Sequence, residues 1–441
     1  MSRELQSEVE RYPEVVRIAQ QLIRFDTTNH GVLAADVEKQ AGRYVMDMLK
    51  EVGYEPEWIE PYPGRPSIVL RIPGQDPSRP GLVLHGHLDV VPAIAEEWDF
   101  DPFAGDIVDG VLRGRGAVDM KDMIAMMICL ARSMARDHWQ PPRDLVVCFF
   151  ADEEAAGKAG AQWIVENRPE LFEGCTEAVS EVGGYNTYVA GKRVYLIQTA
   201  EKGQIWLKLR AKGRAGHGSQ RNDHNAVTAL ARSMAAIGSH SWPIHLTPTV
   251  RQLLTSVADL TGLPFDESDP STLESLVEAL GAASRFVAPT LTTSAQPTQM
   301  TAGYAINVIP SSAEGSVDVR TLPGDDALVR RQLQELMRGV SFEVVFESPS
   351  IESPIDLPIF EAMRESLQED DPGCVVLPYM MSAGTDNKHL ARLGIRGYGF
   401  VPVRLPEDFD FPGMFHAKNE QIPVSALISG EKVLASFIKR S

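Results

Sequence analysis

The sequence predicts an α/β fold, in which a main domain with a mostly parallel sheet is interrupted by an inserted ferredoxin-like (βαββαβ) domain. Three observations predict it. Between residues 67 and 181, short β-rich runs alternate with helical patterns, which is typical of a sheet covered by helices on both faces. Residues 204–347 follow the order β-α-β-β-α-β. After residue 350 come a helix, a strand and a C-terminal helix, which we expect to complete the first sheet.

The main domain is predicted to consist of residues 1–198 and 351–441. The chain has 441 residues, which is more than one hydrophobic core usually supports, so two domains are expected. The predicted strands of its first part are the runs SIVLRI, GLVLHGH, DLVVCFF and TEAVSE. Helices are predicted over 120–136, 160–167 and 358–367, with a further strand over 374–379.

The inserted domain is predicted to span residues 199–350. Its strands are expected at 204–211, 303–309, 315–321 and 341–347, and its helices at 225–237 and 326–337. Residues 245–289 hold further helical patterns that a βαββαβ unit does not require. We interpret them as a helical excursion near the ligand side of the domain or near its interface.

Composition and charge exclude several classes of partner. Sixty acidic residues against 42 basic ones give a formal charge of -18, which opposes binding to nucleic acid or to an anionic membrane. The first 25 residues predict an amphipathic charged helix without a signal-peptide core, and the longest apolar run, 123–131, is too short to span a bilayer. We therefore expect a cytoplasmic protein. Its four cysteines lack C-x-x-C spacing and are expected to be free thiols.

Imidazole and carboxylate groups stand near the ends of successive predicted strands. His87 and Asp89 are two positions apart, so they point to the same side of a strand, and a neighbouring carboxylate commonly orients a metal-binding imidazole. His85 shares that face but lies deeper in the strand, so we interpret it as a packed histidine. Asp119 follows a Gly-x-Gly turn and opens a helix, where it could reach a metal or simply cap the helix.

Further acidic residues extend this pattern. Glu153 and Glu154 follow an apolar strand and point in different directions, so they can have different roles, although such a pair alone is more often part of a solvated loop. Glu181 ends another predicted strand, and His416 lies near the C-terminus, where a single histidine is usually packed or exposed. A two-metal site needs nitrogen or oxygen ligands, a bridging carboxylate and a free carboxylate that accepts a proton. The set as a whole, rather than any one member, predicts such a site.

The motifs occur in the order of a known family. GHLDVVP, WDFDPFAGDIVDGVLRGRGAVDMKD, ADEE, GHGS, NVIP, DVRTLPG, SAGTD and HAKNE run through nearly the whole chain. On these motifs the chain resembles the di-zinc aminoacylase and carboxypeptidase family, which includes acetylornithine deacetylase, succinyl-diaminopimelate desuccinylase and carboxypeptidase S. The residues after Glu181, the segment EKGQIWLKL and the helical excursion look most similar to the carboxypeptidase S branch, which also contains hydrolases of N-fatty-acyl amino acids.

The resemblance implies two divalent metal ions, with zinc expected and cobalt or manganese compatible with the same ligands. It assigns His87 and Glu181 to one metal, Glu154 and His416 to the other, and Asp119 to both. Asp89 would orient His87. Glu153 would be the general base that takes a proton from the metal-bridging water and passes it to the leaving amine. The family often has a cis peptide bond, which would fall after Asp119.

The resemblance also implies residues outside the metal site. His217, otherwise a polar turn residue between glycines, resembles the histidine that family dimers donate across the interface, so a homodimer through the inserted lid and dimerisation domain is expected. Asn307 and Arg320, otherwise ordinary strand residues, resemble substrate contacts, and an arginine suits a terminal carboxylate. Gly384 and Thr385 resemble a turn that offers backbone donors to the same carboxylate.

The function that follows is hydrolysis of the amide bond of a peptide or N-acyl amino acid with a free carboxylate. An N-acetyl or N-succinyl amino acid deacylase of biosynthesis is the alternative within the same class. A non-catalytic binding protein on the same fold is a third interpretation, because fold alone does not confer activity. Such a protein would be expected to lack at least one ligand or Glu153, whereas all are present here.

Overall fold

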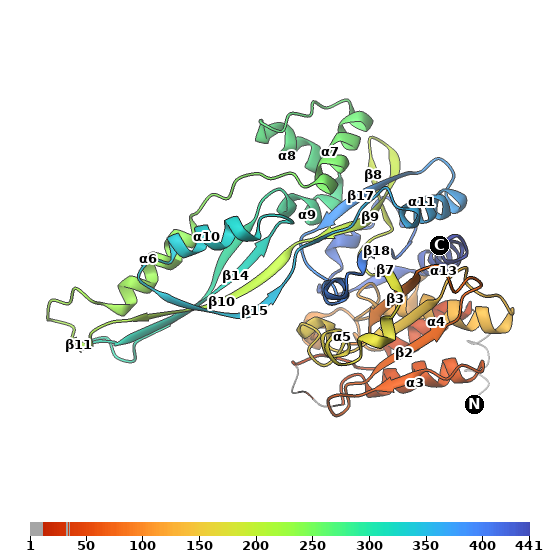
Figure 1. Ribbon diagram of the computed structural model, residues 1–441, viewed down its shortest axis with the longest axis horizontal. Coiled ribbons are helices and arrows are strands. Elements are labelled where there is room, and N and C mark those ends of the chain that lie inside the picture. The colour runs from red at the N-terminus through yellow and green to blue at the C-terminus, as the bar shows by residue number, and fades with distance from the viewer. Residues whose placement is uncertain (1–11, 32–33, 35) are drawn as a thin grey trace.

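The computed structural model describes residues 12–31, 34 and 36–441. It has a main domain built on a ten-stranded sheet and an elongated arm that carries a four-stranded sheet (Figure 1). We call this four-stranded sheet and the two helices that cover it the arm. The predicted N-terminal helix is present from Glu14, and residues 1–11 lie outside the described part of the chain.

The large sheet has a parallel centre, which confirms the predicted α/β class. Its order is β1-β2-β6-β3-β7-β18-β9-β16, with β8 and β17 also paired to β9. The four central strands β6, β3, β7 and β18 are mutually parallel, and antiparallel pairs join the sheet on both sides of them. The strands are β1 (Glu57–Ile59), β2 (Ser67–Ile72), β3 (Gly81–His87), β6 (Leu145–Phe150), β7 (Cys175–Ser180), β8 (Tyr185–Val189), β9 (Lys192–Glu201), β16 (Ile351–Glu352), β17 (Val375–Met381) and β18 (Arg396–Gly399).

Helices cover both faces of this sheet. Every residue of β3 and β6 is buried, so these strands read as continuous apolar runs rather than as alternating patterns. Leu84 and Val147 point into the core shared with α4, whereas Val83 and Val146 point into the core shared with α5. The helices of the main domain are α2 (Glu14–Ile23), α3 (Lys39–Lys50), α4 (Lys121–Arg136), α5 (Ala161–Asn167), α11 (Pro358–Asp370), α12 (Asn387–Leu390) and α13 (Val424–Arg440).

Smaller elements complete the main domain. A three-stranded sheet has the order β19-β5-β4, formed by β19 (Gln421–Pro423), β5 (Val111–Arg113) and β4 (Ile107–Val108). Short 3-10 turns cover Ala95–Glu97, Glu153–Ala155, Pro169–Phe172, Gly281–Ala283, Ala288–Thr290, Ala391–Leu393 and Phe411–Gly413. The four cysteines are free thiols, as expected. Among the described residues, no helix is both long and apolar enough to cross a membrane.

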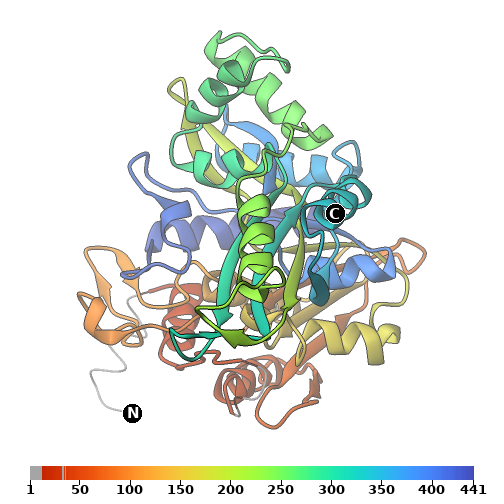
Figure 2. The same cartoon turned by 90° about the vertical axis from the view of Figure 1, so that its left-hand side faces the viewer.

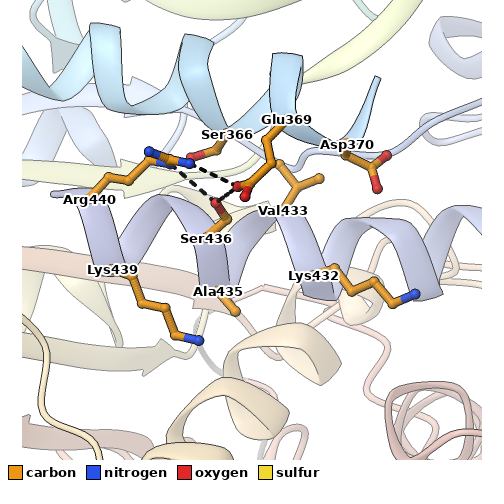
Figure 3. Close-up of a pocket in the computed structure, with 9 residues that line it drawn as sticks. All are labelled: Ser366, Glu369, Asp370, Lys432, Val433, Ala435, Ser436, Lys439 and Arg440. Carbon is orange, nitrogen blue, oxygen red and sulfur yellow. Dashed lines mark hydrogen bonds and ion pairs between the residues drawn. The ribbon is translucent and has the colours of Figure 1, made fainter. Parts of the chain in front are cut away.

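A surface groove lies between α11 and α13, and its lining residues do not include any of the predicted site residues (Figure 3). Arg440 reaches across it to Glu369 with an Nη2 to Oε2 distance of 3.0 Å. Lys432, Lys439 and Asp370 also line the groove, so charges of both signs are mixed there. We assign this groove to helix packing at the surface.

The arm has the ferredoxin-like order. Its sheet runs β12-β14-β10-β15 with all neighbours antiparallel, and α6 and α10 lie along one face of it (Figures 1 and 2). The elements are β10 (Gly203–Lys212), α6 (Ala226–Gly238), β12 (Ser294–Ala302), β14 (Ser312–Thr321), α10 (Asp326–Leu336) and β15 (Ser341–Ser348).

One strand prediction in the arm is wrong. The strand expected at 303–309 lies instead at 294–302, because the backbone turns at Gly303, whose φ is 72°. β12 is an edge strand with an exposed, polar sequence and a bulge next to Pro297, so it lacks the apolar alternation that marks a half-buried strand. Within 303–309 only β13 (Val308–Ile309) is a strand, and it pairs with β11 (Gly216–His217).

The helical excursion belongs to the main domain by its packing. It consists of α7 (Pro248–Thr261), α8 (Pro270–Glu278) and α9 (Ser284–Val287). Its buried side chains, such as Leu253 and Leu276, join the core of the large sheet rather than that of the arm, and α7 and α9 lie against β17. Residues 199–350 therefore do not form a single inserted unit, because the helices in their middle third pack into the core of the main domain.

Candidate metal centre

The carboxyl ends of neighbouring parallel strands carry the predicted metal ligands. β3 ends at His87, Glu181 directly follows β7, and the 3-10 turn Glu153–Ala155 follows β6. Ligands of open α/β sheets bind at this edge, where the strand ends meet. His85 lies further back in β3, is buried as expected, and has its Nε2 2.9 Å from Asn387 Oδ1.

Asp119 lies between the two predicted histidine ligands. Its Oδ1 is 3.1 Å from His87 Nε2, and its Oδ2 is 3.2 Å from His416 Nε2. Glu181 Oε2 lies 3.5 Å from the same nitrogen of His87, and Glu154 Oε2 lies 3.2 Å from that of His416. We call these five residues the ligand cluster. It has two halves that share Asp119.

Two loops bring Asp119 and His416 to the strand ends, and Glu420 ties them together. The Glu420 carboxylate is fully buried and accepts the backbone N–H groups of Gly116, Val118 and Asp119 at 2.9, 2.8 and 3.1 Å. The peptide bond after Asp119 is cis, as the resemblance implied. Because Glu420 follows His416 by four residues, its bonds fix the distance between the two loops.

The donor set of the ligand cluster fits divalent metal ions. The side chains of Asp119, Glu154 and Glu181 are only 6 to 8% exposed, and carboxylates crowded in a buried site disfavour one another's ionisation. Burial raises the pKa of Glu154 to about 8, and the charge of Asp119 adds to that rise. Burial also raises the pKa of Glu181 well above its ordinary value. Divalent cations, which accept imidazole and carboxylate ligands, would balance this negative charge.

Asp89 fixes the backbone of both adjacent glutamates. Its Oδ1 accepts the N–H of Glu153 at 3.2 Å, and its Oδ2 accepts the N–H of Glu154 at 3.1 Å and the side-chain amide of Asn29 at 2.7 Å. His87 Nδ1 lies 2.9 Å from the Asp89 backbone carbonyl but 3.6 Å from its carboxylate. Asp89 therefore contacts the ring of His87 through its carbonyl and lies within ion-pair range of it through its carboxylate. That Asp89 orients His87 as a metal ligand stays a prediction.

A buried arginine behind the ligand cluster escaped the sequence analysis. Arg65 is fully buried and bonds Glu38 at 2.6 and 2.7 Å and Asp152 at 2.9 Å. Asp152 in turn accepts the side-chain amide of Asn29 at 3.1 Å, and that amide also reaches Asp89. Arg65 and Glu38 belong to none of the motifs and are distant in sequence, so only the fold brings them here.

His217 and Asn307 lie together at the far tip of the arm, where β11 pairs with β13 (Figure 1). The His217 side chain is exposed, and its Nδ1 lies 2.8 Å from Ser219 Oγ. The Gly218 N–H donates to the Asn307 carbonyl at 2.9 Å. Within the described chain, no hydrogen bond or ion pair joins either residue to the ligand cluster. A single chain therefore does not bring them to it.

The other predicted substrate residues are largely engaged already. Arg320 holds Asp318 with two bonds of 2.9 and 3.0 Å. Thr385 donates its N–H and its hydroxyl to Glu201 at 2.9 and 2.7 Å. The Thr385 amide therefore differs from the prediction of an open donor, because the buried Glu201 takes it. Gly384 stays half-buried at the surface of the turn.

The parallel strand ends, the clustered imidazole and carboxylate ligands and the adjacent Glu153 define a metal-dependent hydrolase of amide bonds. The chain belongs to peptidase family M20/M25/M40, which matches residues 83–440. The resemblance inferred from the motifs is thereby confirmed.

Relatives of this chain cover most of its length. Aminoacylase-1 of Mus musculus is 24% identical over 404 residues, which are 90% of this chain and 88% of that protein. The N-fatty-acyl-amino acid synthase/hydrolase PM20D1 of Homo sapiens is 27% identical over 406 residues, covering 87% and 78% of the two chains. Among solved structures, the M20 family metallo-carboxypeptidase Sso-CP2 from Sulfolobus solfataricus matches with a TM-score of 0.73 over 97% of this chain and 99% of that one. At 16% identity this similarity shows a common fold.

Proposed function

We propose that this protein hydrolyses the amide bond of a peptide or N-acyl amino acid that keeps a free carboxylate. The observation that carries the proposal is the ligand cluster, in which Asp119 lies between two histidines and Glu153 stands beside them. The relatives support the substrate class, because one is an aminoacylase and another a hydrolase of N-fatty-acyl amino acids. A deacylase of N-acetyl or N-succinyl amino acids is the closest alternative.

Each member of the ligand cluster has a role in this proposal. His87 and Glu181 would hold one cation, Glu154 and His416 the other, and Asp119 both. Zinc is proposed, and cobalt or manganese suits the same donors. When bound, two such ions polarise the scissile carbonyl and lower the pKa of the attacking water.

Glu153 moves the proton in this proposal. Its carboxylate takes a proton from the attacking water and passes it to the leaving amine, which a positioned side chain does most effectively when its backbone is fixed. Asp89 fixes that backbone by accepting the Glu153 N–H. Burial raises the pKa of Glu153, and the nearby charge of Lys388 opposes that rise.

The arm completes the site from a second copy of the chain. His217 and Asn307 lie at its tip, so we propose a homodimer through the arms in which these residues reach the partner's ligand cluster and His217 stabilises the developing oxyanion. Arg320, on the same arm, would then contact the substrate if it leaves Asp318. A cytoplasmic location stays a prediction.

Two neighbouring substitutions test the roles of the glutamates. Glu153→Gln should lower kcat by roughly 10²- to 10⁴-fold while metal content stays near wild type, because proton transfer is lost and coordination is not. Glu154→Ala, the matched control one residue away, should lose metal as well. Metal analysis of the purified proteins and steady-state kinetics measure both. Near wild-type turnover in Glu153→Gln, or two retained metals in Glu154→Ala, would contradict the assignment.

A further inference from the structure

Lys388 is a largely buried lysine near Glu153 whose ammonium keeps some contact with solvent and has no bonding partner among the described residues. It lies on α12, three residues after Thr385, and is only 6% exposed. Its backbone N–H donates to the Thr385 carbonyl at 3.2 Å. Among the described residues, no hydrogen bond or ion pair reaches its Nζ.

The other buried lysines of the chain are satisfied. Lys202, 2% exposed, donates to the carbonyls of Pro289 and Thr292 at 2.8 Å each. Lys121, 1% exposed, donates to the carbonyl of Phe25 at 2.8 Å. A buried charge without a partner is costly, so it is normally paired or hydrogen-bonded. Lys388 differs from both lysines, because its ammonium is unpaired among the described residues and is reached by solvent, so it is open to an anion from outside the chain.

The acidic residues near Lys388 are not its bonding partners. The oxygens of Glu201 accept hydrogen bonds from the N–H and the hydroxyl of Thr385 and from the Gln198 side chain. Both oxygens of Asp386 are buried and unbonded, but Asp386 and Lys388 are two positions apart on a helix and do not face each other. These acids lie close enough for Lys388 to oppose the burial-driven rise of their pKa values, yet none comes within ion-pair distance.

Lys388 lies beside the Gly384 turn, and its charge acts on Glu153. A Cβ placed on Gly384 would be 3.7 Å from Lys388 Nζ, so the ammonium lies directly beside the open surface of the turn. Lys388 is also the leading charge that counteracts the effect of burial on the pKa of Glu153. The cation is therefore close enough to influence the carboxylate that we propose moves the proton.

We propose that Lys388 binds the free carboxylate of the substrate. The inference rests on the proposed function, and it identifies the residue that would recognise the carboxylate shared by the proposed substrates. In an N-acyl amino acid, only the Cα separates the carboxylate from the scissile amide nitrogen, so a cation that influences Glu153 and borders the Gly384 turn is well placed to bind that carboxylate. The other candidates are occupied in this structure, Arg320 by Asp318 and the Thr385 amide by Glu201. A lysine ammonium offers three donors to such an anion.

The competing interpretation is that Lys388 only balances Glu153, Asp386 and Glu201. Substrate charge separates the two interpretations. A carboxylate-binding residue acts only on substrates that carry the carboxylate, whereas a balancing charge affects every substrate through the same Glu153. The preference for a free acid over its carboxamide is therefore the quantity to measure.

The test uses N-acetyl-L-leucine and N-oleoyl-L-leucine, each as the free acid and as the carboxamide, with metal-loaded full-length protein. Lys388→Met should lower kcat/KM for the acids about tenfold or more beyond any loss on the carboxamides, chiefly through KM, because one charge-assisted contact is lost. A loss shared by all four compounds reports the removal of the charge near Glu153. Lys388→Gln is the second variant, in case the methionine variant does not fold. Lys202→Met is the matched control, since its ammonium is engaged with carbonyl groups, and should keep the wild-type ratio of acid to carboxamide.

Two results would overturn the inference. One is an equal loss on acid and carboxamide in the Lys388 variants, and the other is a wild-type protein that does not prefer the acid. Calorimetric titration with the same four compounds gives an independent measurement. If the wild type cleaves neither acid, the proposed function fails. In that case the titration still tests Lys388. Wild-type protein that binds an acid more tightly than its carboxamide, with the difference lost in Lys388→Met, would support carboxylate binding by Lys388, and equal binding of the two compounds would count against it.

Discussion

At the scale of single residues, Asp89 has more influence than its place in a His-x-Asp pair indicates. Its carboxylate holds the backbone of Glu153 and of Glu154, so one side chain positions both the proposed base and a proposed ligand. Its backbone carbonyl holds His87. A change at this position therefore alters three members of the site together, even though Asp89 is not itself one of the ligands.

Asp89→Asn should weaken metal binding and activity together, by roughly 10- to 100-fold, as is typical when a residue that orients metal ligands is changed. A carboxamide has only one accepting oxygen, so one of the two backbone N–H groups would face an NH₂ group. Metal titration of the apo-protein and kcat measurements check this. The Asn29 amide, which also bonds Asp89, provides the comparison: Asn29→Ala removes a donor but leaves both glutamate amides bonded, and should have the smaller effect.

Lys202 gives a prediction about pH. Burial and the charge of Arg320 lower its pKa from 10.5 to about 8, while Asp318 opposes the change. Between these two pH values the unfolded chain binds more protons than the folded one, so the contribution of Lys202 to stability rises with pH across that window. The thermal midpoint of wild type should therefore rise relative to that of Lys202→Met as pH rises from about 8 towards 10.5. A difference that stays constant or shrinks would contradict this.

The sequence predicted the candidate ligands that stand in a recognisable local pattern, either a strand end or a family motif. His87, Glu154 and Glu181 stand at or just after strand ends, and His416 lies within a family motif. Lys388 and Arg65 lie outside the motifs, and Glu420, although it ends the motif HAKNE, gave no sign of its role, since all three roles depend on contacts between distant segments. Glu420, for example, bonds the amide of Gly116, 304 positions away. Charge and burial decide these roles, and only the folded chain shows them.

At the scale of elements, close packing of β18 against the end of β7 positions Glu181. A Cβ on Gly399 would lie 2.2 Å from the Glu181 carbonyl and 2.6 Å from Gln198 Oε1. Gly183 is similarly constrained, since its Cβ would lie 2.0 Å from the Gly399 carbonyl. Neither position has room for a side chain, so the backbone around Glu181 is fixed from two sides.

Gly399→Ala should therefore displace Glu181 and lower both metal content and thermal stability. Gly394→Ala is the control just before the same strand. Its Cβ meets no atom within 4 Å, and its φ of 77° makes the substitution strained, so it should cost about 1 kcal/mol without loss of metal. Metal analysis and thermal melts of the two variants check this. Full metal content in Gly399→Ala would show that the strand end tolerates the shift.

Elements were predictable where hydrophobic patterning is strong. The buried strands β3 and β6 and the helix α4 lie where their apolar runs place them. The polar edge strand β12 was missed, because pairing with β14 rather than burial holds it in place. The helical excursion was recognised as helical, yet its packing on β17 was not, since amphipathic helices do not indicate which surface they cover.

At the scale of the whole molecule, the separation of the arm tip from the ligand cluster leads to a prediction about mixed dimers. Glu153→Gln and His217→Ala subunits, each inactive alone, are unfolded together and refolded as a mixture. In a mixed dimer one site has both Glu153 and His217 intact, while the other has both changes. Random assortment makes about half of the dimers mixed, so about a quarter of wild-type activity should return. No recovery from a mixture that contains mixed dimers would mean that His217 does not serve the partner's site.

The packing of α7 to α9 on the large sheet also determines how the protein can be dissected. In the described chain the backbone passes between arm and main domain at four places: from β9 to β10, from α6 to α7, from residue 290 to β12, and from β15 to β16. A deletion of residues 203–348 would excise Leu253, Leu276 and their neighbours from the core that they fill. A shortened, arm-free protein must therefore retain residues 246–291, rejoined by two separate linkers. Swapping arms between relatives likewise requires two exchanged segments rather than one.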